Sequence, residues 1–357
     1  MKFVHIADLH LDAKFDNLGQ IEGIPTKRRI EQRKAMRDII DYIKENNVEI
    51  LLIAGDLYEQ NYIKKSSIEY INNLFLEIPN VKIFISPGNH DPYISNSFYA
   101  TYDWAKNVHI FKEEIEKIDI DEKTHIYGYG FTDFYCKESE IEEIKIEEPK
   151  DINILLTHGT LDGGTEEREY NPLKSNKLKK LGFNYIALGH IHKPYYNEEK
   201  NQQIFYPGSI ISLGFDELGK RGMLAGELKK DSINIEFIPI DKREFEEKEI
   251  DVTDLSSNED ILTKIEEMQL NDENFYKIVL VGKRFFKIDI ENIKKALGIS
   301  NIIKVKDKTK IGVDIETLQK ENNIKGIFVR NMLEKQQIEN LDKDFIEKAI
   351  EIGLEVL

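Results

Sequence analysis

The first ninety residues alternate short hydrophobic runs with longer segments of helical periodicity. The runs at 3–7, 50–54 and 81–85 have the length and mainly apolar character of buried strands. Between them, apolar residues recur every three or four positions after Pro25 and again after Ser66, the predicted N-cap of the second helix. This β-α-β-α-β order predicts parallel strands joined by crossover helices.

The central part of the chain contains further strand patterns. The runs at 152–156 and 185–188 are again mainly hydrophobic, whereas in the strand expected at 233–238 apolar and polar side chains alternate from Ile233 to Phe237. Strict alternation predicts an antiparallel strand with one exposed face, and Pro239 marks the end of that strand or the edge of its sheet. The middle of the chain therefore extends the predicted α/β architecture.

The pattern changes after a densely charged stretch at 242–248, which we interpret as a domain boundary. Helices at 260–268 and 289–297 and strands at 276–282 and 302–305 are expected beyond it. Two amphipathic helical segments follow, near 322–336 and 343–354. Because 357 residues exceed the usual capacity of one compact core, we expect a first domain at 1–245, a small α+β domain at 246–320 and a helical C-terminal segment at 321–357.

Five of the predicted strands end in residues that bind metal ions. The five motifs are Asp8-Leu9-His10, Gly55-Asp56, Gly88-Asn89-His90, His158-Gly159 and Gly189-His190-Ile191-His192. The carboxyl ends of parallel strands share one edge of a sheet, where ligands gather. Side chains two positions apart on a strand point to the same side, so Asp8 and His10 can face one cation. Five of the 8 histidines lie in these motifs, which makes chance placement a poor explanation.

The types of ligand predict a pair of divalent cations. Carboxylate, amide and imidazole groups together suit Mn²⁺, Fe²⁺ or Zn²⁺ better than Ca²⁺, which prefers oxygen ligands alone. The motifs contain no cysteine, which argues against a structural zinc site. Asp56 stands alone at its strand end and is the best candidate for a carboxylate that bridges two cations about 3.5–4 Å apart.

Composition restricts the binding partners and the cellular compartment that we expect for the protein. A net charge of −16 argues against a general nucleic-acid coat protein, although two divalent cations would supply about four positive charges where a phosphate sits. No hydrophobic run reaches the length of a membrane span, and the first residues lack the pattern of a signal peptide. The single Cys136 fits a reducing compartment. We expect a cytoplasmic protein with no membrane contact.

The order of the motifs resembles that of the calcineurin-like metallophosphoesterases over about residues 1–240. The resemblance implies a β-sandwich with flanking helices in α-β-β-α order. It also implies two metal sites that share one ligand: Asp8, His10, Asp56 and His192 for the first, and Asp56, Asn89, His158 and His190 for the second. His90 would protonate the leaving oxygen or stabilise the transition state, and a hydroxide bridging the two metals would attack phosphorus. Mn²⁺ is the first expectation, with Fe²⁺ or Zn²⁺ as alternatives.

Within this superfamily the chain is most similar to the SbcD/YhaO-type subunits of DNA double-strand-break repair nucleases. The shared motifs are Ile6-Ala7-Asp8-Leu9-His10-Leu11, Ala54-Gly55-Asp56-Leu57-Tyr58, Pro87-Gly88-Asn89-His90-Asp91, Leu188-Gly189-His190-Ile191-His192 and Tyr206-Pro207-Gly208-Ser209. Asp12 stands where SbcD-type chains commonly have Gly, and Glu59 lies where some relatives have His, which favours the YhaO type. The resemblance implies DNA exonuclease or endonuclease activity, an SMC-like or ABC-type ATPase partner (SbcC/YhaN-like) and a homodimer.

Two cationic residues are candidates for substrate binding. Lys193 directly follows His192, and Arg221 lies further along the chain; both are predicted to contact a phosphate backbone. The C-terminal helices either pack on their own domain or bind a partner. The rival functions are a small-substrate phosphatase or cyclic-nucleotide phosphodiesterase, and a non-catalytic architectural subunit. The additional C-terminal domain favours a polymeric substrate, and the complete set of ligands argues against an inactive subunit.

Overall fold

The computed structural model describes residues 1–15, 18, 23–163, 170–196, 202–298, 301–312, 315–339 and 341–357. These residues divide into two compact units, Met1–Glu244 and Phe245–Leu357. Within the second unit, the helices near the C-terminus have a hydrophobic cluster of their own. The three-part division expected from the sequence stays a prediction.

Six strands form the first sheet of the N-terminal unit, in the order β13-β12-β1-β2-β3-β4. Their bounds are β1 Lys2–Ile6, β2 Ile50–Ile53, β3 Lys82–Ile85, β4 Val108–Ile110, β12 Gly222–Lys229 and β13 Ser232–Pro239. The pairs β1–β2, β2–β3 and β3–β4 are parallel, and β12–β13 is antiparallel. The predicted parallel unit and the predicted antiparallel strand are both confirmed.

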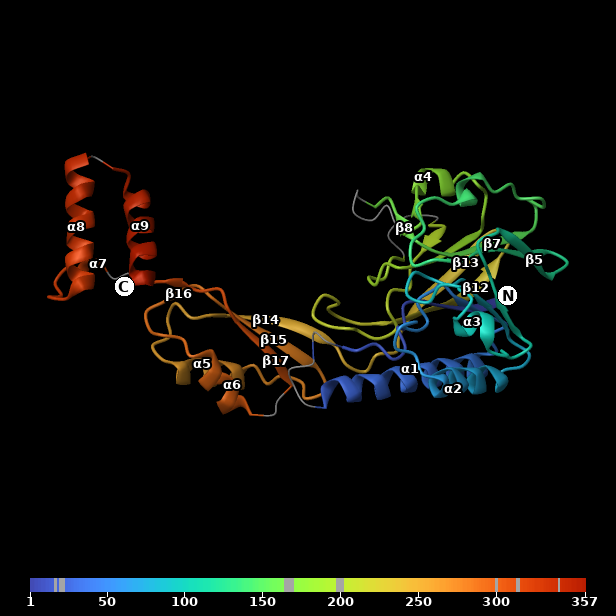
Figure 1. Cartoon of the computed structure of the whole chain (residues 1–357), viewed down its shortest axis with the longest axis horizontal. Coiled ribbons are helices and arrows are strands. Elements are labelled where there is room, and N and C mark those ends of the chain that lie inside the picture. The colour runs from blue at the N-terminus through green and yellow to red at the C-terminus, as the bar shows by residue number, and fades with distance from the viewer. Residues whose placement is uncertain are drawn as a thin grey trace. The chain divides into compact units, whose positions relative to one another are not determined.

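Two helices, α1 (Ile24–Asn46) and α2 (Lys65–Leu76), are the crossovers between β1, β2 and β3. They lie side by side along one side of the N-terminal unit (Figure 1). Pro25 occupies the first turn of α1, where a missing N–H has no intrahelical partner to lose. The second helix begins two residues earlier than predicted, with Lys64 at its N-cap, so Ser66 lies inside it.

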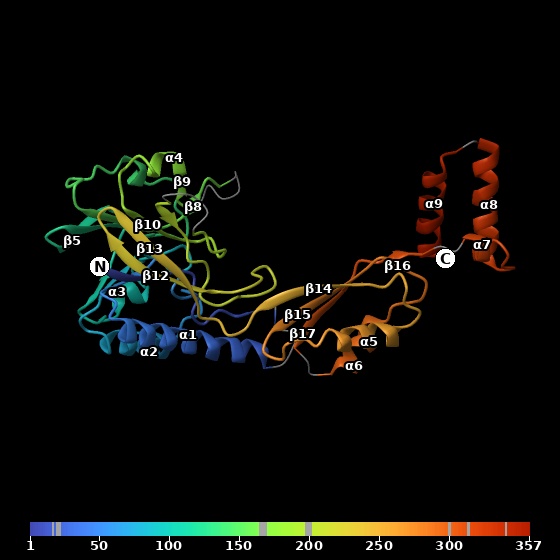
Figure 2. The same cartoon turned by 180° about the vertical axis from the view of Figure 1, so that it is seen from behind.

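A second sheet packs against the first. Its order is β11-β10-β7-β6-β5, and its strands are β5 Glu116–Asp121, β6 Thr124–Tyr129, β7 Ile152–His158, β10 Tyr185–Gly189 and β11 Ile204–Phe205. Along β10, Tyr185 and Ala187 join a core that includes Phe3 and Leu52 of the first sheet. Alternate residues of the same strand, such as Ile186, join a separate cluster on the outer face. The two sheets therefore form the predicted β-sandwich, seen from behind in Figure 2.

Short elements complete the N-terminal unit. They are α3 Phe98–Thr101, the 3₁₀ helix η2 Glu140–Glu143, β8 Thr160–Leu161, β9 Pro172–Leu173 and α4 Ser175–Leu178. Ile141 of η2, Leu173 of β9 and Leu178 of α4 pack into the outer cluster of the second sheet. They cover the face of that sheet opposite the sandwich core.

The second unit opens with a parallel three-stranded sheet, β14-β15-β17. Its elements are β14 Phe245–Asp251, α5 Asn258–Glu267, β15 Phe275–Val281, β16 Lys283–Arg284, α6 Ile290–Leu297, β17 Ile302–Asp307 and β18 Lys310–Ile311. Ile261 of α5 and Ile293 of α6 share a core with Ile278 of β15, and both helices lie on one face of the sheet (Figure 1). The charged stretch at 242–248 is therefore not only a boundary, because it contains the start of β14.

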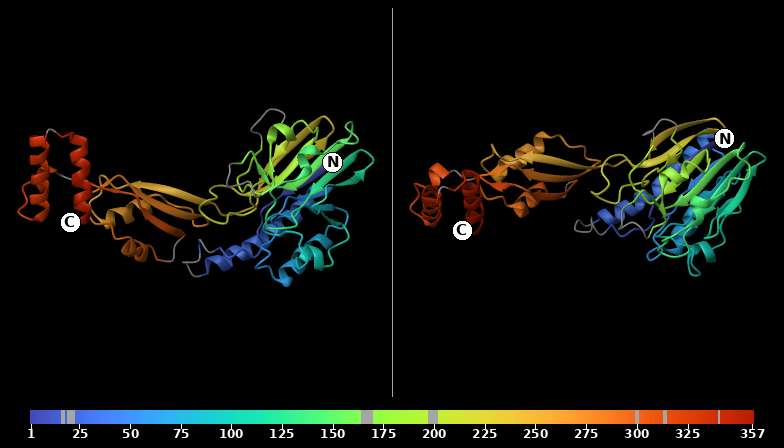
Figure 3. Two further views of the ribbon diagram at one scale, coloured as in Figure 1. Left: turned by 45° about the horizontal axis from the view of Figure 1, so that its top comes forward. Right: turned by 90° about the horizontal axis from the view of Figure 1, so that it is seen from above.

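The chain ends in α7 Ile315–Leu318, α8 Ile324–Glu339 and α9 Lys343–Val356. The last two helices lie side by side in every view (Figure 3) and share the buried residues Val329, Ile346, Ile350 and Leu354. We call α8 and α9 together the helical hairpin. No helix in the described ranges is long and apolar enough to cross a lipid bilayer.

Candidate metal centre

The five predicted ligand motifs meet at one edge of the sandwich. Asp8, Asp56 and Asn89 follow strands β1, β2 and β3 of the first sheet, while His158 and His190 lie at the ends of β7 and β10 of the second. Three groups of potential ligand atoms, each within 4.8 Å, are Asp8 with His10 and His192, His10 with Asp56 and His90, and Asp56 with His158 and His190. The structure therefore brings together ligands from both sheets.

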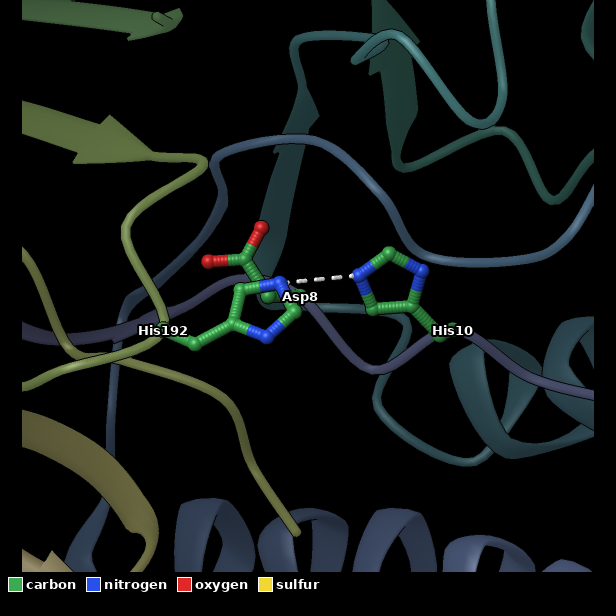
Figure 4. Close-up of side chains that lie close together, drawn as sticks. All are labelled: Asp8, His10 and His192. Atoms are coloured by element: carbon green, nitrogen blue, oxygen red, sulfur yellow. Dashed lines mark hydrogen bonds between the residues drawn. The ribbon is translucent and has the colours of Figure 1, made fainter. Parts of the chain in front are cut away.

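In the first group, two imidazole rings face each other beside a buried carboxylate (Figure 4). Nε2 of His10 lies 3.1 Å from Nε2 of His192. The outward Nδ1 atoms contact carboxylates, at 2.8 Å for His10 and Glu59 and 2.6 Å for His192 and Glu217. Each Nδ1 can thus donate its proton outward, which leaves the Nε2 lone pair for a cation. Metal–nitrogen bonds of about 2.0–2.1 Å place neighbouring ligand nitrogens roughly 3 Å apart, so this geometry fits a metal ion.

The second group has the same construction. His158 donates from Nδ1 to the carbonyl oxygen of Ala54 at 2.8 Å, and its Nε2 lies 3.3 Å from Oδ2 of Asp56. Oδ1 of Asn89 lies 3.0 Å from Nε2 of His158 and 3.2 Å from Nδ1 of His190. Oδ2 of Asp56 is also 3.7 Å from Nε2 of His10. Asp56 therefore lies between the two groups, where a bridging carboxylate would have to be.

The backbone at the site adopts conformations that most residues avoid. Asp8, His10 and Asp56 have φ angles of 53°, 49° and 52°, in the left-handed region that costs energy for residues other than glycine. Glycines allow the tightest approaches. A Cβ atom at Gly88 would lie 2.3 Å from Oδ1 of Asp56, and one at Gly189 would lie 1.8 Å from the carbonyl oxygen of Ala54. The strand ends can come this close only because these positions lack side chains.

The electrostatics of the cluster favour a bound cation. Burial alone would lower the pKa of the His158 and His192 imidazoles, because it disfavours their charged forms. Asp56 beside His158, and Glu217 beside His192, outweigh that effect and raise the pKa of each ring to about 9. The carboxylates of the cluster thus favour nearby positive charge, which protons on the imidazoles supply when no metal is bound. Divalent cations can supply that charge more effectively.

His90 lies at the open rim of the cluster, with 45% of its side chain exposed. Its ring packs edge-on against His10 at a centroid distance of 4.7 Å. Burial lowers the pKa of His90, but the hydrogen bond with Glu59 and the charge of Asp56 raise it to about 9 overall. Although His90 is within ligand distance of His10 and Asp56, a protonated ring at the rim suits a proton donor. The acid role of His90 stays a prediction.

The two predicted substrate contacts have different environments. Lys193 is exposed and directly follows His192 in the chain. Arg221 is only 4% exposed, and its guanidinium donates to the carbonyl oxygens of His192 and Leu218. In this structure Arg221 therefore supports the loop that carries His192 instead of facing solvent. Contact of either residue with substrate stays a prediction.

Three carboxylates that hold the ligands were not among the predicted site residues. Glu217 orients His192, and Glu59 contacts both His10 and His90. Oδ1 of Asp91 accepts from the backbone N–H groups of Asp56 and Gly88, while Oδ2 accepts from Leu57 N–H and the Tyr99 hydroxyl. Asp91 and Glu59 lie close to recognisable motifs, whereas nothing in the sequence around Glu217 indicates its role.

An aromatic pair extends outward from one metal-ligand candidate. The ring of Tyr170 lies 5.0 Å from that of His190, tilted by 33°. The ring of Tyr135 follows at 6.1 Å from Tyr170, tilted by 30°, and Tyr135 is 55% exposed. Asn171 donates from Nδ2 to the carbonyl oxygen of His158 at 2.7 Å, which fixes the neighbouring backbone relative to the cluster.

The chain is similar to several known proteins. The calcineurin-like phosphoesterase family matches residues 1–194. An uncharacterized metallophosphoesterase, YhaO of Bacillus subtilis (strain 168), is 26% identical over 276 residues, which are 75% of this chain and 67% of that protein. Among solved structures, TT1561 of Thermus thermophilus has a TM-score of 0.40 at 8% identity, covering 67% of this chain and 99% of that one. GAP50, the anchor in the inner membrane complex of Plasmodium, has a TM-score of 0.40 at 12% identity, covering 68% and 85%.

The family match spans more than half of the chain and contains all five ligand motifs. The donor set, its burial and its paired imidazoles fit divalent metal ions independently of that match. This chain belongs to the calcineurin-like metallophosphoesterases, a family of metal-dependent phosphoester hydrolases.

Proposed function

We propose that this chain is a two-metal-dependent DNA nuclease of the SbcD/YhaO type, which hydrolyses phosphodiester bonds in DNA repair. Family membership supports phosphoester hydrolysis but is equally compatible with a small-substrate phosphatase. The observation that favours a nucleic acid is the aromatic pair Tyr135–Tyr170 beside His190. Bases of any sequence stack on exposed aromatic rings such as that of Tyr135, at about 1–3 kcal/mol per base.

The order of the rings, from His190 through Tyr170 to the exposed Tyr135, bears on the size of the substrate. Tyr170 contacts a ligand candidate and Tyr135 lies one ring further out, half exposed. A nucleotide whose phosphate sits on the cluster could stack its base, or a neighbouring base, on Tyr135. A simple phosphate monoester would leave this surface unused, which is why the pair favours a strand of nucleic acid.

The site offers distinct tasks to its residues during hydrolysis. When bound, two cations, which we propose to be Mn²⁺, would neutralise phosphate charge and lower the pKa of water. Asp56 would hold both sites at a fixed separation, and Asp8, His10 and His192 would orient the first of them. His90, at the exposed rim, would give its Nε2 proton to the leaving oxygen as the P–O bond breaks.

The helical hairpin is the proposed binding site for a partner. Its exposed large hydrophobic residues are Ile324, Ile327, Ile338, Phe345, Ile352 and Val356. Surfaces of this kind commonly bind a partner helix or groove. We propose that they bind the coiled coil of an SMC-like ABC-type ATPase (SbcC/YhaN-like), while the homodimer expected from the resemblance stays a prediction.

A nuclease assay with defined substrates tests the proposed function. Linear duplex and single-stranded DNA, labelled at the 5′ or 3′ end, would be incubated with Mn²⁺, Mg²⁺, Fe²⁺ or Zn²⁺. We expect degradation that depends on Mn²⁺ and is lost in Asp56→Ala. Hydrolysis of p-nitrophenyl phosphate or cyclic nucleotides without any cleavage of DNA would instead support the small-substrate enzyme. Loss of all hydrolysis in a fully metal-loaded protein would support the architectural subunit.

A further inference from the structure

Asn171 directly follows Tyr170 of the aromatic pair and is fully buried. Its Nδ2 atom donates to the carbonyl oxygen of His158 at 2.7 Å and to the Thr157 hydroxyl at 3.3 Å. Its Oδ1 atom accepts from the Ser139 hydroxyl at 2.6 Å. The buried amide thus uses both of its hydrogens and its oxygen, so its place between these segments is closely defined.

The main chain of Asn171 is tied to the same two segments. Its N–H donates to the carbonyl oxygen of Cys136 at 2.6 Å, and its carbonyl oxygen accepts from the Thr160 N–H at 3.2 Å. A Cβ atom at Gly159 would lie only 2.5 Å from the Asn171 carbonyl oxygen, so the segments pack without room for a side chain there. The φ angle of Asn171 is 49°, a conformation in which asparagine is enriched.

These contacts connect the aromatic pair to the candidate metal centre through one residue. The hydrogen bonds of Asn171 fix the backbone directly after Tyr135 and directly after Tyr170. The same residue holds the backbone of His158, whose imidazole belongs to the second ligand group. The place of the two rings relative to that group is therefore set before a substrate arrives. A surface that is ordered in advance loses less conformational entropy on binding.

We propose that Asn171 is a positioning residue that aligns the aromatic pair with the candidate metal centre, and so sets where a stacked base lies relative to the scissile phosphate. Its bond to Ser139 holds the loop that carries Tyr135, and its bond to His158 holds that loop to the end of β7. Because Asn171 is buried, it acts through the tyrosines and not by touching the substrate. The inference rests on the proposed function as a DNA nuclease.

Asn171→Gly tests this role selectively, because glycine adopts a positive φ without strain and removes only the side-chain bonds. The ligands would be two short single strands with phosphorothioate linkages that resist cleavage, one with bases and one with abasic sugars. We expect affinity for the first strand to fall about 5–20-fold and affinity for the abasic strand to fall less than about twofold. Equal losses for both strands would show that Asn171 does not act through stacking and would overturn the proposal.

A double-mutant cycle shows whether the loss passes through Tyr135. Tyr135→Leu removes the exposed ring, so Asn171→Gly in that background should weaken binding by less than about twofold more. Ser139→Ala breaks only the link to the loop that carries Tyr135, and it should also weaken the strand with bases selectively. Fully additive losses in the double variant would mean that Asn171 acts on binding by another route, against the proposal.

Asn153→Ala is the matched control for a general loosening of the fold. Asn153 is also fully buried, near the other end of β7, and its Nδ2 atom donates to the carbonyl oxygens of Glu148 and Asp151. We expect this variant to lose thermal stability without losing affinity for either strand. A selective loss for the strand with bases in Asn153→Ala would show that loosening, and not alignment, explains the result.

Nuclear Overhauser contacts between ring protons supply a readout that needs no substrate. The rings of Tyr170 and His190 lie 5.0 Å apart, so selectively labelled, metal-free protein should show a cross-peak between them. We expect the cross-peak to be lost in Asn171→Gly and kept in Asn153→Ala, and its persistence in Asn171→Gly would refute the alignment. If the wild type neither bound nor cleaved DNA, the proposed function would fail, and the cross-peak would still decide whether Asn171 holds the rings.

Discussion

The Nε2 atoms of His10 and His192 lie 3.1 Å apart although 182 positions separate the two residues in the chain. Each ring is turned by a carboxylate on its far side, Glu59 for His10 and Glu217 for His192. Two nitrogen lone pairs at this distance repel each other unless a cation or a proton lies between them. The orientation of the two rings is therefore the one that a shared metal ion requires, as expected in a family of metal-dependent enzymes.

Asp56→Asn should nearly eliminate hydrolysis. Asp56 is buried between the two ligand groups, and replacing its charge with an amide removes the proposed bridge. Loss of an outer hydrogen-bond partner of a metal ligand already costs about 10–100-fold, so we expect a loss of more than about 100-fold here. Elemental analysis of the purified variant should show reduced metal content. A variant that retained two metals and wild-type turnover would contradict the assignment of Asp56.

His90→Asn should separate metal binding from catalysis. The His90 side chain lies at the rim, where its proton can reach a leaving group without its ring being needed as a ligand. General acid catalysis contributes about 10²–10⁴-fold, so we expect kcat to fall within that range while metal content stays normal. Collapse of metal binding in this variant would show that His90 is a ligand instead.

Tyr135→Leu should weaken the binding of DNA. Tyr135 is the exposed ring of the aromatic pair, and stacking of about 1–3 kcal/mol corresponds to roughly fivefold to 150-fold in affinity. Fluorescence anisotropy with a short single strand would measure the change. Tyr135→Phe is the control, because it keeps the ring and should bind nearly as well as the wild type. Equal affinities for all three proteins would exclude this surface from substrate binding.

Phe345→Asp should weaken the proposed ATPase complex without affecting the metal centre. Phe345 is exposed on α9 of the helical hairpin, and a charge there would have to be buried on binding. An anchor residue of an interface typically contributes about 2 kcal/mol or more, so we expect at least about tenfold weaker binding by calorimetry. Lys348→Asp, on the same helix, controls for added negative charge. Unchanged binding in Phe345→Asp would place the interface elsewhere.

The pH dependence of stability should carry a contribution from His125, away from the ligand groups. Nδ1 of His125 lies 2.6 Å from Asp119, and Nε2 lies 3.3 Å from Asp151. Burial lowers the pKa of His125, but these hydrogen bonds outweigh burial and raise the pKa above 6.5. The folded protein therefore binds this proton more tightly than the unfolded chain does. The resulting stabilisation is complete below pH 6.5 and is lost as the pH rises through the folded pKa.

Urea denaturation in the presence of a chelator would measure this effect against His125→Gln. We expect the difference in unfolding free energy between wild type and variant to shrink as the pH rises from about 6 to about 9. Using the difference removes contributions from other titrating groups. A gap that stayed constant or widened over this range would show that His125 is not stabilised in its protonated form.

Much of the candidate metal centre could be predicted because strand ends carry strong sequence signals. Short, mainly hydrophobic runs locate β1, β2, β3, β7 and β10, and parallel pairing within each sheet brings their polar ends to one edge. The sequence indicates Asp8, His10 and Asp56 because these residues directly follow such runs. It cannot indicate Glu217, which reaches His192 from a loop whose path depends on tertiary packing.

Other features escaped prediction for similar physical reasons. Strand β14 buries only Phe245 and Ile250 along its length, so hydrophobic periodicity is too weak to reveal it among charged neighbours. A charged residue near a predicted site is normally expected to face solvent. Arg221 is buried instead, and its guanidinium donates hydrogen bonds to backbone carbonyl oxygens. In both cases long-range contacts, and not local pattern, decide the outcome.

The origin of the ligands in two separate sheets has a thermodynamic consequence. Asp8 and Asp56 belong to one half of the sandwich, and His158 and His192 to the other. A cation held by both halves is released when they part, so occupancy adds to the free energy of unfolding. A single site contributes about 2.7 kcal/mol when free metal exceeds its dissociation constant 100-fold. The melting temperature of this chain would then rise and fall with the supply of its divalent metal, so that starvation for the metal would shorten the lifetime of the fold as well as stop the chemistry.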